Sequence, residues 1–94
     1  MASFSVYLII SNKNNKVYSY VGYTNNLKAR IEKHNNSKGA KYTKGKLWKL
    51  AYYKNYKSKS RAMSEEYKLK KNYKLRNKIK LKYLKNEDIN FITI

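Results

Sequence analysis

The stretch YSYVGYTNNLKARIEKHNNSKGAKYT, residues 18–43, decides the fold. It begins as a strand, because two sets of residues alternate around Gly22 with the side-chain period of two. The two sets are Val17, Ser19 and Val21, and Tyr18, Tyr20 and Tyr23. The alternation stops at Thr24, Asn25 and Asn26, residue types that favour the N-cap of a helix. The stretch therefore predicts a strand that turns directly into a helix.

One face of this predicted helix has mixed chemistry. Its residues are spaced at i, i+3, i+4 and i+7, and they are Leu27, Arg30, Ile31 and His34. A helical face that packs on a core should be apolar throughout, so Arg30 and His34 are candidate functional residues. A second interpretation of His34 is a surface cation near a helix C-terminus, where it would complement the helix dipole.

The strand on the N-terminal side of this stretch completes a hairpin. Residues Phe4 to Ser11 alternate, with Val6, Leu8 and Ile10 on one face and Tyr7 and Ile9 on the other. Asn12 to Asn15 has the composition of a turn, and Lys16 to Tyr23 returns as an antiparallel partner. We expect the phenols of Tyr7 and Tyr20 to converge near the start of the first helix.

These residues together resemble the GIY-YIG nuclease family, whose second signature tripeptide ends a tyrosine-bearing strand. Tyr20-Val21-Gly22 stands at that tripeptide, and Val6-Tyr7-Leu8 stands at the first one, with Val6 in place of the family's glycine. Tyr23 stands where some repair relatives have a lysine. The resemblance covers roughly residues 5 to 80, and segment 35–43 is most similar to the small stand-alone bacterial and viral branch. The Tyr7–Tyr20 spacing implies a turn slightly longer than in compact members.

The resemblance implies a catalytic set and a metal ligand. The catalytic set is Tyr7, Tyr20, Arg30, His34 and Glu66, and Glu66 would bind a single Mg²⁺ or Mn²⁺ ion. Tyr18 is a rival to Tyr20 on the same strand face, and Glu65 is a rival to Glu66. The family's asparagine after the glutamate helix has two candidates, Asn72 and Asn77.

Arg30 is unusual on composition alone. Only three of the 23 cations are arginine, and a planar guanidinium can bind a phosphate with two hydrogen bonds. Net charge is +18, with five acidic residues. An AT-rich genome would explain the excess of lysine but would not remove aspartate and glutamate. The composition therefore favours a polyanionic partner, a nucleic acid above all, over a ribosome-associated role or an acidic membrane surface. Among nucleic acids, the resemblance favours DNA.

The chain length predicts one domain over residues 1–94, with a core of about 4–80 and an extension at 81–94. Such a chain buries only about 60–65 % of its unfolded surface. The absence of cysteine excludes disulfides, a thiol nucleophile and a cysteine zinc site. We expect a cytoplasmic protein without a membrane partner, since no stretch resembles a membrane span or a signal peptide. The resemblance implies a bacterial or viral origin.

A basic segment follows the first helix. Lys38 to Lys46, KGAKYTKGK, predicts a flexible loop suited to backbone phosphates and to base stacking, with a plain solvated connection as the alternative. The candidate nucleic-acid-binding residues are Lys38, Lys41, Tyr42, Lys44 and Lys46, together with Lys70 further along.

The last third of the chain supplies a strand and two helices. Leu47 to Tyr56 predicts the third strand, and Ser58 or Ser60 can cap a second helix. The inward residues of that helix are predicted to be Ala62, Glu66, Leu69 and Tyr73. An inward carboxylate is costly unless a cation pairs with it, so Glu66 is a candidate metal ligand or the partner of a nearby lysine.

The spacing of apolar residues after this helix predicts a further helix, although a strand is an alternative. Lys68 to Lys85 predicts a third helix, while the KIKLKY alternation within it would suit a strand. Ile89 to Ile94 is an apolar tail that we expect to add a short strand or to cover the core.

The predicted fold class is α/β, more narrowly α+β, with a small three-stranded and mainly antiparallel sheet flanked by about three helices. The resemblance implies a metal-dependent endonuclease that hydrolyses DNA phosphodiester bonds and leaves 5′-phosphate ends. Tyr7, helped by His34 and Tyr20, would activate water, and Arg30 would neutralise the developing charge. The alternative is a basic nucleic-acid-binding domain without catalysis, associated with RNA or the ribosome.

Overall fold

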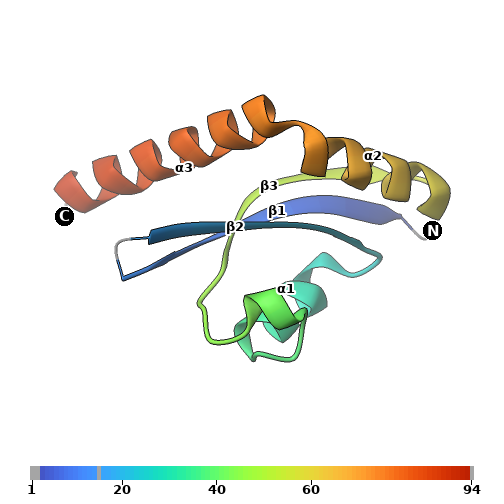
Figure 1. The fold of residues 1–94 in the computed structure, drawn as a ribbon, viewed down its shortest axis with the longest axis horizontal. Helices are drawn as coiled ribbons and strands as arrows, with labels where there is room; N and C mark the ends of the chain where they lie inside the picture. Colours follow the sequence, from blue (N-terminus) through green and yellow to red (C-terminus); the bar gives the residue numbers. More distant parts are fainter. Residues whose placement is uncertain (1–2, 15, 94) are drawn as a thin grey trace.

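The computed structural model describes residues 3–14 and 16–93, and their side chains as far as Lys85. Within these residues the chain forms three strands, three α-helices and one short 3₁₀ helix (Figure 1). In order they are β1 (Phe4–Lys13), β2 (Lys16–Thr24), α1 (Leu27–Asn35), η1 (Lys41–Thr43), β3 (Lys49–Tyr56), α2 (Lys59–Lys71) and α3 (Tyr73–Thr93). The predicted α+β fold is confirmed. Over the described residues, no helix has the length and apolar character that a membrane crossing needs.

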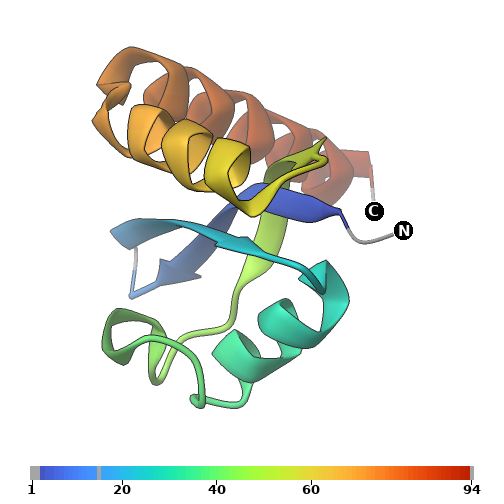
Figure 2. The same cartoon turned by 90° about the vertical axis from the view of Figure 1, so that its right-hand side faces the viewer.

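The sheet has the strand order β2-β1-β3, and both neighbours of β1 run antiparallel to it. Figure 2 shows three layers, with α2 and α3 on one face of the sheet and α1 and the η1 segment on the other. The central strand is therefore covered on both faces, which explains why all residues from Ser5 to Ser11 are buried.

Strand alternation divides the core into two clusters. The cluster beneath α2 is apolar and contains Val6, Leu8, Val21, Ala62 and Leu69. The cluster facing α1 contains Tyr7, Ile9 and Trp48. Tyr23, which the sequence pattern grouped with Tyr18 and Tyr20, packs instead on the α2 side, because Gly22 occupies the α1-facing position between Tyr20 and Thr24.

The hairpin turn is shorter than the predicted segment Asn12 to Asn15. Pairing continues to Lys13 and Lys16, so Asn12 and Lys13 belong to β1. Asn14 has a φ of 52°, in the left-handed region that asparagine tolerates in tight turns. The separation of Tyr7 and Tyr20 thus comes from longer paired strands, and the expected longer turn is wrong. Asn15 lies outside the described residues.

Side-chain caps fix where the helices begin. The Asn26 side chain accepts a hydrogen bond from the Ala29 backbone N–H, 3.1 Å away, and Ser58 caps α2 in the same way through Arg61. Asn72 follows α2 and caps α3 by accepting from the Leu75 N–H at 3.1 Å. Of the two predicted serine caps, the structure uses Ser58.

Three expectations for the second half of the chain are wrong. Tyr73, predicted to face inward, is 70 % exposed, because α2 ends before Asn72 and Tyr73 begins a new helix. The strand alternative for KIKLKY fails because α3 runs through it. The short strand at Ile89 to Ile94 is helix as far as Thr93. Ile94, and the side chains that would cover the core, lie outside the described residues.

The third strand and the third helix otherwise follow the prediction. β3 begins at Lys49, two residues after the predicted start at Leu47, whose side chain is exposed. Ile79 of α3 packs against the apolar cluster beneath α2. The two helices therefore cover one face of the sheet and leave the other face to α1 and the η1 segment.

Candidate active site

A cavity of about 540 Å³ lies at the outer edge of β2. Arg30 of α1 lines it from one face of the sheet, and Glu66 of α2 lines it from the other. Helices on opposite faces can reach the same cavity because β2 has no strand on its outer side. The other lining residues are Phe4, Tyr7, Tyr20, Gly22, Tyr23, Thr24, Asn25 and Lys59. Four of the five predicted catalytic residues thus line one cavity.

Gly22 gives the Tyr7 phenol its place in this cavity. The two residues are paired across β1 and β2. A Cβ atom added at Gly22 would overlap the Tyr7 hydroxyl. The Tyr7 ring lies 6.5 Å from the Tyr20 ring, centroid to centroid. The glycine of the second tripeptide therefore makes room for the tyrosine of the first.

His34, the fifth predicted residue, lies behind Tyr7. It is 1 % exposed, so the alternative of a surface cation is wrong. Its Nε2 atom is 2.8 Å from the Tyr7 hydroxyl, and its Nδ1 atom is 2.9 Å from the Thr43 hydroxyl. The Tyr20 ring contacts the imidazole edge-on, with the two ring centroids 5.1 Å apart. Burial lowers the pKa of His34, and the Arg30 charge lowers it further.

The electrostatics hold the Tyr7 phenol in its protonated form. Burial raises the pKa of Tyr7 above its ordinary value of about 10, and Tyr20 and Glu66 raise it further, while Arg30 acts in the opposite direction. Nε2 of His34 lies at hydrogen-bond distance from this phenol, and it can accept the phenol's proton when the proton of the neutral ring is on Nδ1. Tyr7 therefore holds its proton next to a group that can accept it.

Glu66 is the acidic residue of the cavity. Its side chain is 17 % exposed, and the Lys70 ammonium lies 3.5 Å from its carboxylate, so the predicted pairing with a lysine exists. Among the described residues, no three His, Cys, Asp or Glu side chains lie together in an arrangement that could hold a metal ion. Mg²⁺ is often held through one or two carboxylates and keeps several waters, so a single glutamate in a roomy cavity fits such an ion.

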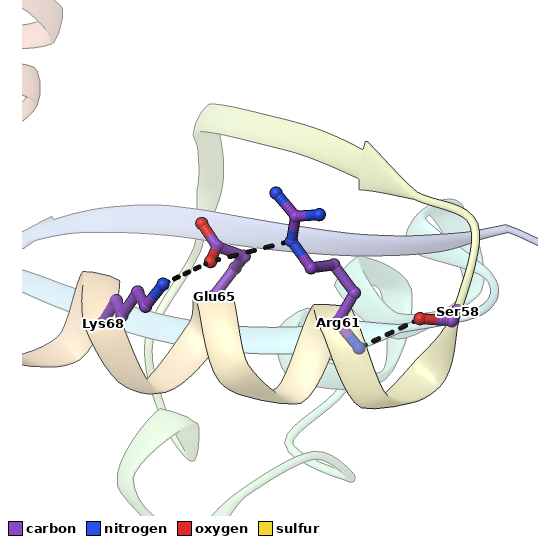
Figure 3. Close-up of polar contacts among 4 residues, drawn as sticks. All are labelled: Ser58, Arg61, Glu65 and Lys68. Carbon is purple, nitrogen blue, oxygen red and sulfur yellow. Dashed lines mark hydrogen bonds and ion pairs between the residues drawn. The ribbon is translucent and has the colours of Figure 1, made fainter.

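Glu65 faces a different environment. Figure 3 shows its carboxylate between Arg61 and Lys68 on the surface of α2, at 3.9 and 3.1 Å. The hydrogen bond from Lys68 lowers the pKa of Glu65. Glu65 and Asn72 line a second hollow that Tyr7 does not reach. Asn77 lies near Ser19 in a third one, so neither candidate asparagine lines the Tyr7 cavity.

Tyr18 and the basic loop form a neighbouring surface. Tyr18 does not line the cavity, although it lies on the Tyr20 side of the sheet. Tyr42 is 49 % exposed and stacks on Tyr20, with ring centroids 6.2 Å apart and planes at 22°. The Lys46 ammonium lies over the rings of Tyr18 and Tyr42 at 4.8 and 5.0 Å. The exposed lysines of the loop are Lys38, Lys41 and Lys44.

The loop is anchored, whereas a flexible connection was expected. Residues 41–43 form the η1 turn, and the Trp48 indole N–H donates to the Thr43 carbonyl at 3.0 Å. Gly39 packs on His34 so closely that an added Cβ would overlap the ring. Thr43 and Lys59 were not among the predicted site residues, and no local pattern distinguishes either of them. Each is identified only by what it contacts in the folded chain.

Comparison with known proteins places this geometry in context. The model of the GIY-YIG catalytic domain matches residues 3–80. A UPF0213 protein of Pediococcus acidilactici is 47 % identical over 73 residues, which cover 74 % of this chain and 71 % of that protein. A UPF0213 protein of Oceanobacillus iheyensis is 50 % identical over 52 residues, which cover 54 % of this chain and 60 % of that protein.

One solved structure is also similar. It is the solution NMR structure of a UPF0213 protein from Bacillus halodurans, 38 % identical, with 88 % of this chain and 85 % of that chain covered and a TM-score of 0.45. The alignment with the Oceanobacillus protein covers about three fifths of that protein's length, so its remaining residues have no counterpart in the match.

Proposed function

The chain belongs to the family of GIY-YIG catalytic domains, and we propose that it is a metal-dependent endonuclease that hydrolyses phosphodiester bonds in DNA. The observation that supports this most directly is the cavity at the edge of β2, where a phenol pair, a guanidinium and a carboxylate converge from four elements. We take residues 1–94 as a single catalytic domain, with its core at about 4–80 and an extension at 81–94.

The scissile phosphate would bind in the cavity at the edge of β2, between α1 and α2. Arg30 lies on the α1 side of the cavity and Lys59 on the α2 side, so both can contact phosphate oxygens. In this position the Arg30 guanidinium stabilises the negative charge that builds up on the phosphorus oxygens in the transition state. Tyr20 forms the wall between Tyr7 and the exposed loop and positions the water with its hydroxyl.

Water activation would use Tyr7 and His34 as a pair. The attacking water gives a proton to the Tyr7 oxygen while the Tyr7 hydroxyl proton moves to Nε2 of His34, 2.8 Å away. The water oxygen then bonds to phosphorus, the bond to the 3′-oxygen breaks, and that oxygen takes a proton from solvent. The products carry a 5′-phosphate and a 3′-hydroxyl. This route avoids a free phenolate, which the burial of Tyr7 disfavours.

Glu66 would hold a single Mg²⁺ or Mn²⁺ ion, whose chemistry is to polarise the phosphate and to stabilise the leaving 3′-oxygen. Lys70 would leave Glu66 for a DNA phosphate, since it is exposed. The basic loop, with Lys38, Lys41, Tyr42, Lys44 and Lys46, would bind the backbone and stack on a base. A net charge of +18 supports a polyanionic substrate.

Cleavage of supercoiled plasmid and of a branched DNA, in Mg²⁺, Mn²⁺ or EDTA, tests the proposal with matched variants. Glu66→Gln alters the cavity, whereas Glu65→Gln removes the neighbouring charge of the same helix outside it. Arg30→Ala and Arg61→Ala form a second pair. We expect metal-dependent nicking that falls at least about 10²-fold in the two cavity variants and stays within a few-fold of wild type in the two controls.

Equal cleavage by all four variants would contradict the proposed site. The strongly basic composition supports a second candidate, a nucleic-acid-binding domain without catalysis. Its expected result is no cleavage by any protein, together with tight binding at low salt that weakens steeply with salt and does not respond to Glu66→Gln.

A further inference from the structure

Thr43 has a polar side chain buried beside the proposed site. It is 0 % exposed, and its hydroxyl lies 2.7 Å from the Ala40 carbonyl oxygen and 2.9 Å from Nδ1 of His34. The hydroxyl therefore has two partners, one on its own turn and one on α1. It does not line the cavity, so it can affect the chemistry only through His34.

The direction of these two hydrogen bonds follows from the atoms involved. A carbonyl oxygen can only accept, so the single proton of the Thr43 hydroxyl lies on the bond to Ala40. The Thr43 oxygen must then accept from His34, which requires the proton of the ring to be on Nδ1. In the neutral ring Nε2 is consequently unprotonated and accepts the hydroxyl proton of Tyr7.

The surrounding contacts hold Thr43 in this orientation. Its carbonyl accepts the Trp48 indole N–H at 3.0 Å, and its backbone N–H donates to the Ala40 carbonyl at 3.0 Å. Gly39 packs directly on the imidazole, which brings the η1 segment against His34. Trp48 is 2 % exposed, so water does not compete for these groups. The hydroxyl thus points at Nδ1 because the backbone around it is fixed.

We propose that Thr43 is a positioning residue for the reaction: it fixes His34 as the Nδ1–H tautomer, so that Nε2 is free to take the proton of Tyr7 as Tyr7 takes one from the attacking water. This inference rests on the proposed nuclease function for its kinetic consequence only. The opposite tautomer would direct an N–H at the Tyr7 oxygen, and the phenol could then give no proton to the ring.

The tautomer can be measured directly, because the chain contains one histidine. Long-range ¹H–¹⁵N NMR of histidine-labelled protein distinguishes a protonated from an unprotonated ring nitrogen. We expect wild type to show a protonated Nδ1 and an unprotonated Nε2 at pH 7.5. Thr43→Val keeps the shape but lacks the hydroxyl, and it should show a mixture or the Nε2–H form. Thr43→Ser keeps the hydroxyl and should resemble wild type.

Single-turnover cleavage supplies the kinetic test. We expect Thr43→Val to lower the rate constant about 10- to 100-fold, by analogy with the loss of a hydrogen-bond partner that orients a metal-bound histidine, and to leave DNA affinity in EDTA unchanged. Thr43→Ser should recover the rate to within a few-fold. If Thr43 had a structural role alone, Thr43→Val would lower the stability without changing the tautomer. Wild type, Thr43→Val and Thr43→Ser would then show the same protonation of the two ring nitrogens by NMR.

Two results would overturn the inference. One is a protonated Nε2 in wild type, and the other is a Thr43→Val protein with the wild-type tautomer and the wild-type rate. If Thr43→Val does not fold, the wild-type spectrum still decides the first point, and Thr43→Ala, which also lacks the hydroxyl, decides the second. If wild type cleaves no DNA, the proposed function fails while the tautomer measurement remains a test of Thr43.

Discussion

The two faces of the sheet contrast sharply, although the same central strand supplies both. Toward α2, β1 presents Val6 and Leu8 to an apolar cluster. Toward α1 it presents Tyr7, whose hydroxyl begins a buried chain of hydrogen bonds through His34 to Thr43. One face is held by burial of apolar surface, which has no direction, and the other by bonds whose donors and acceptors must match.

This difference separates stability from chemistry within one small domain. Apolar packing responds to substitution in proportion to the volume removed, and neighbouring side chains relax in part. A buried hydrogen-bond chain loses its function when one proton is misplaced, even where the shape is kept. We therefore expect substitutions in the apolar cluster beneath α2 to change the free energy of unfolding, and substitutions in the hydrogen-bond chain of the α1 face to change the rate of cleavage.

The largest expected effect is on the α1 face. Tyr7→Phe removes the hydroxyl that would receive the water's proton in the proposed reaction, and the cleavage rate should fall about 10³-fold, or about 4 kcal/mol. The free energy of unfolding should fall by only about 1–2 kcal/mol, because Nε2 of His34 loses its partner. Single-turnover cleavage and urea unfolding measure the two quantities.

Tyr53→Phe is the matched control for this variant. Tyr53 pairs with Tyr7 across β1 and β3, but it is 52 % exposed and does not line the cavity. Its loss of a hydroxyl should leave both quantities within error of wild type. A cleavage rate for Tyr7→Phe within threefold of wild type would show that the two faces do not divide their roles in this way.

The next largest effect is expected on the α2 face. Leu8 is fully buried in the apolar cluster, so Leu8→Ala should lower the free energy of unfolding by about 3 kcal/mol. The cleavage rate of the folded fraction should change less than twofold. Urea unfolding followed by circular dichroism gives the first value. Leu81→Ala, at a position 59 % exposed, should cost less than about 0.5 kcal/mol.

The fold was predictable where local rules decide it. Strand alternation in β1 assigned Val6 and Leu8 to one face and Tyr7 to the other, and both assignments hold. The helix starts at Leu27 and Lys59 follow from caps one residue earlier. These rules fail where two of them compete. Asn72 can continue α2 or cap a new helix, and capping prevails, which exposes Tyr73.

From the sequence, a site residue could be predicted only where its neighbours on the same helix or strand indicate which way its side chain faces. The apolar neighbours Ala62 and Leu69 indicate that Glu66 faces inward, and Glu66 lines the cavity. Thr43 has no such signal, because its role depends on His34, nine residues away and on another element. A contact formed by folding an irregular segment onto a helix has no period, so periodicity cannot reveal it.

A smaller effect is expected at Gly22, where the two faces meet. Gly22→Ala places a methyl group against the Tyr7 hydroxyl, and the phenol must move relative to His34. A displacement of about 1 Å can cost about 10²-fold in rate, so cleavage should fall by about that factor. Because Tyr7 is buried, the added methyl group should also lower the free energy of unfolding, by about 1–3 kcal/mol. The backbone of Gly22 is not in the left-handed region, so alanine itself introduces no strain there.

Ser19→Ala provides the comparison on the same strand, because Ser19 points to the other face and does not line the cavity. Its cleavage rate should stay within twofold of wild type. If Gly22→Ala cleaves as fast as Ser19→Ala, the position of the Tyr7 hydroxyl is not critical, and the α1 face would be as tolerant as the α2 face.

The smallest effect is the pH dependence that His34 gives to stability. Burial and the Arg30 charge lower the pKa of His34 in the folded state, whereas the unfolded chain has the ordinary value of about 6.5. As the pH falls below that value, the unfolded state takes up the proton first, so the free energy of unfolding decreases until the folded pKa is passed. Above that window the stabilising contribution is complete. The slope cannot exceed about 1.4 kcal/mol per pH unit.

Urea unfolding of wild type and His34→Gln between pH 8 and pH 5 isolates this contribution. The groups that face His34 from the neighbouring elements are Tyr7, Tyr20, Arg30 and Thr43, and His34→Gln leaves all four of them in place. The difference between the two curves therefore reports His34 alone, and it should narrow as the pH falls. A difference that stays constant would mean that His34 titrates alike in both states, and that the polar chain of the α1 face does not hold the ring neutral.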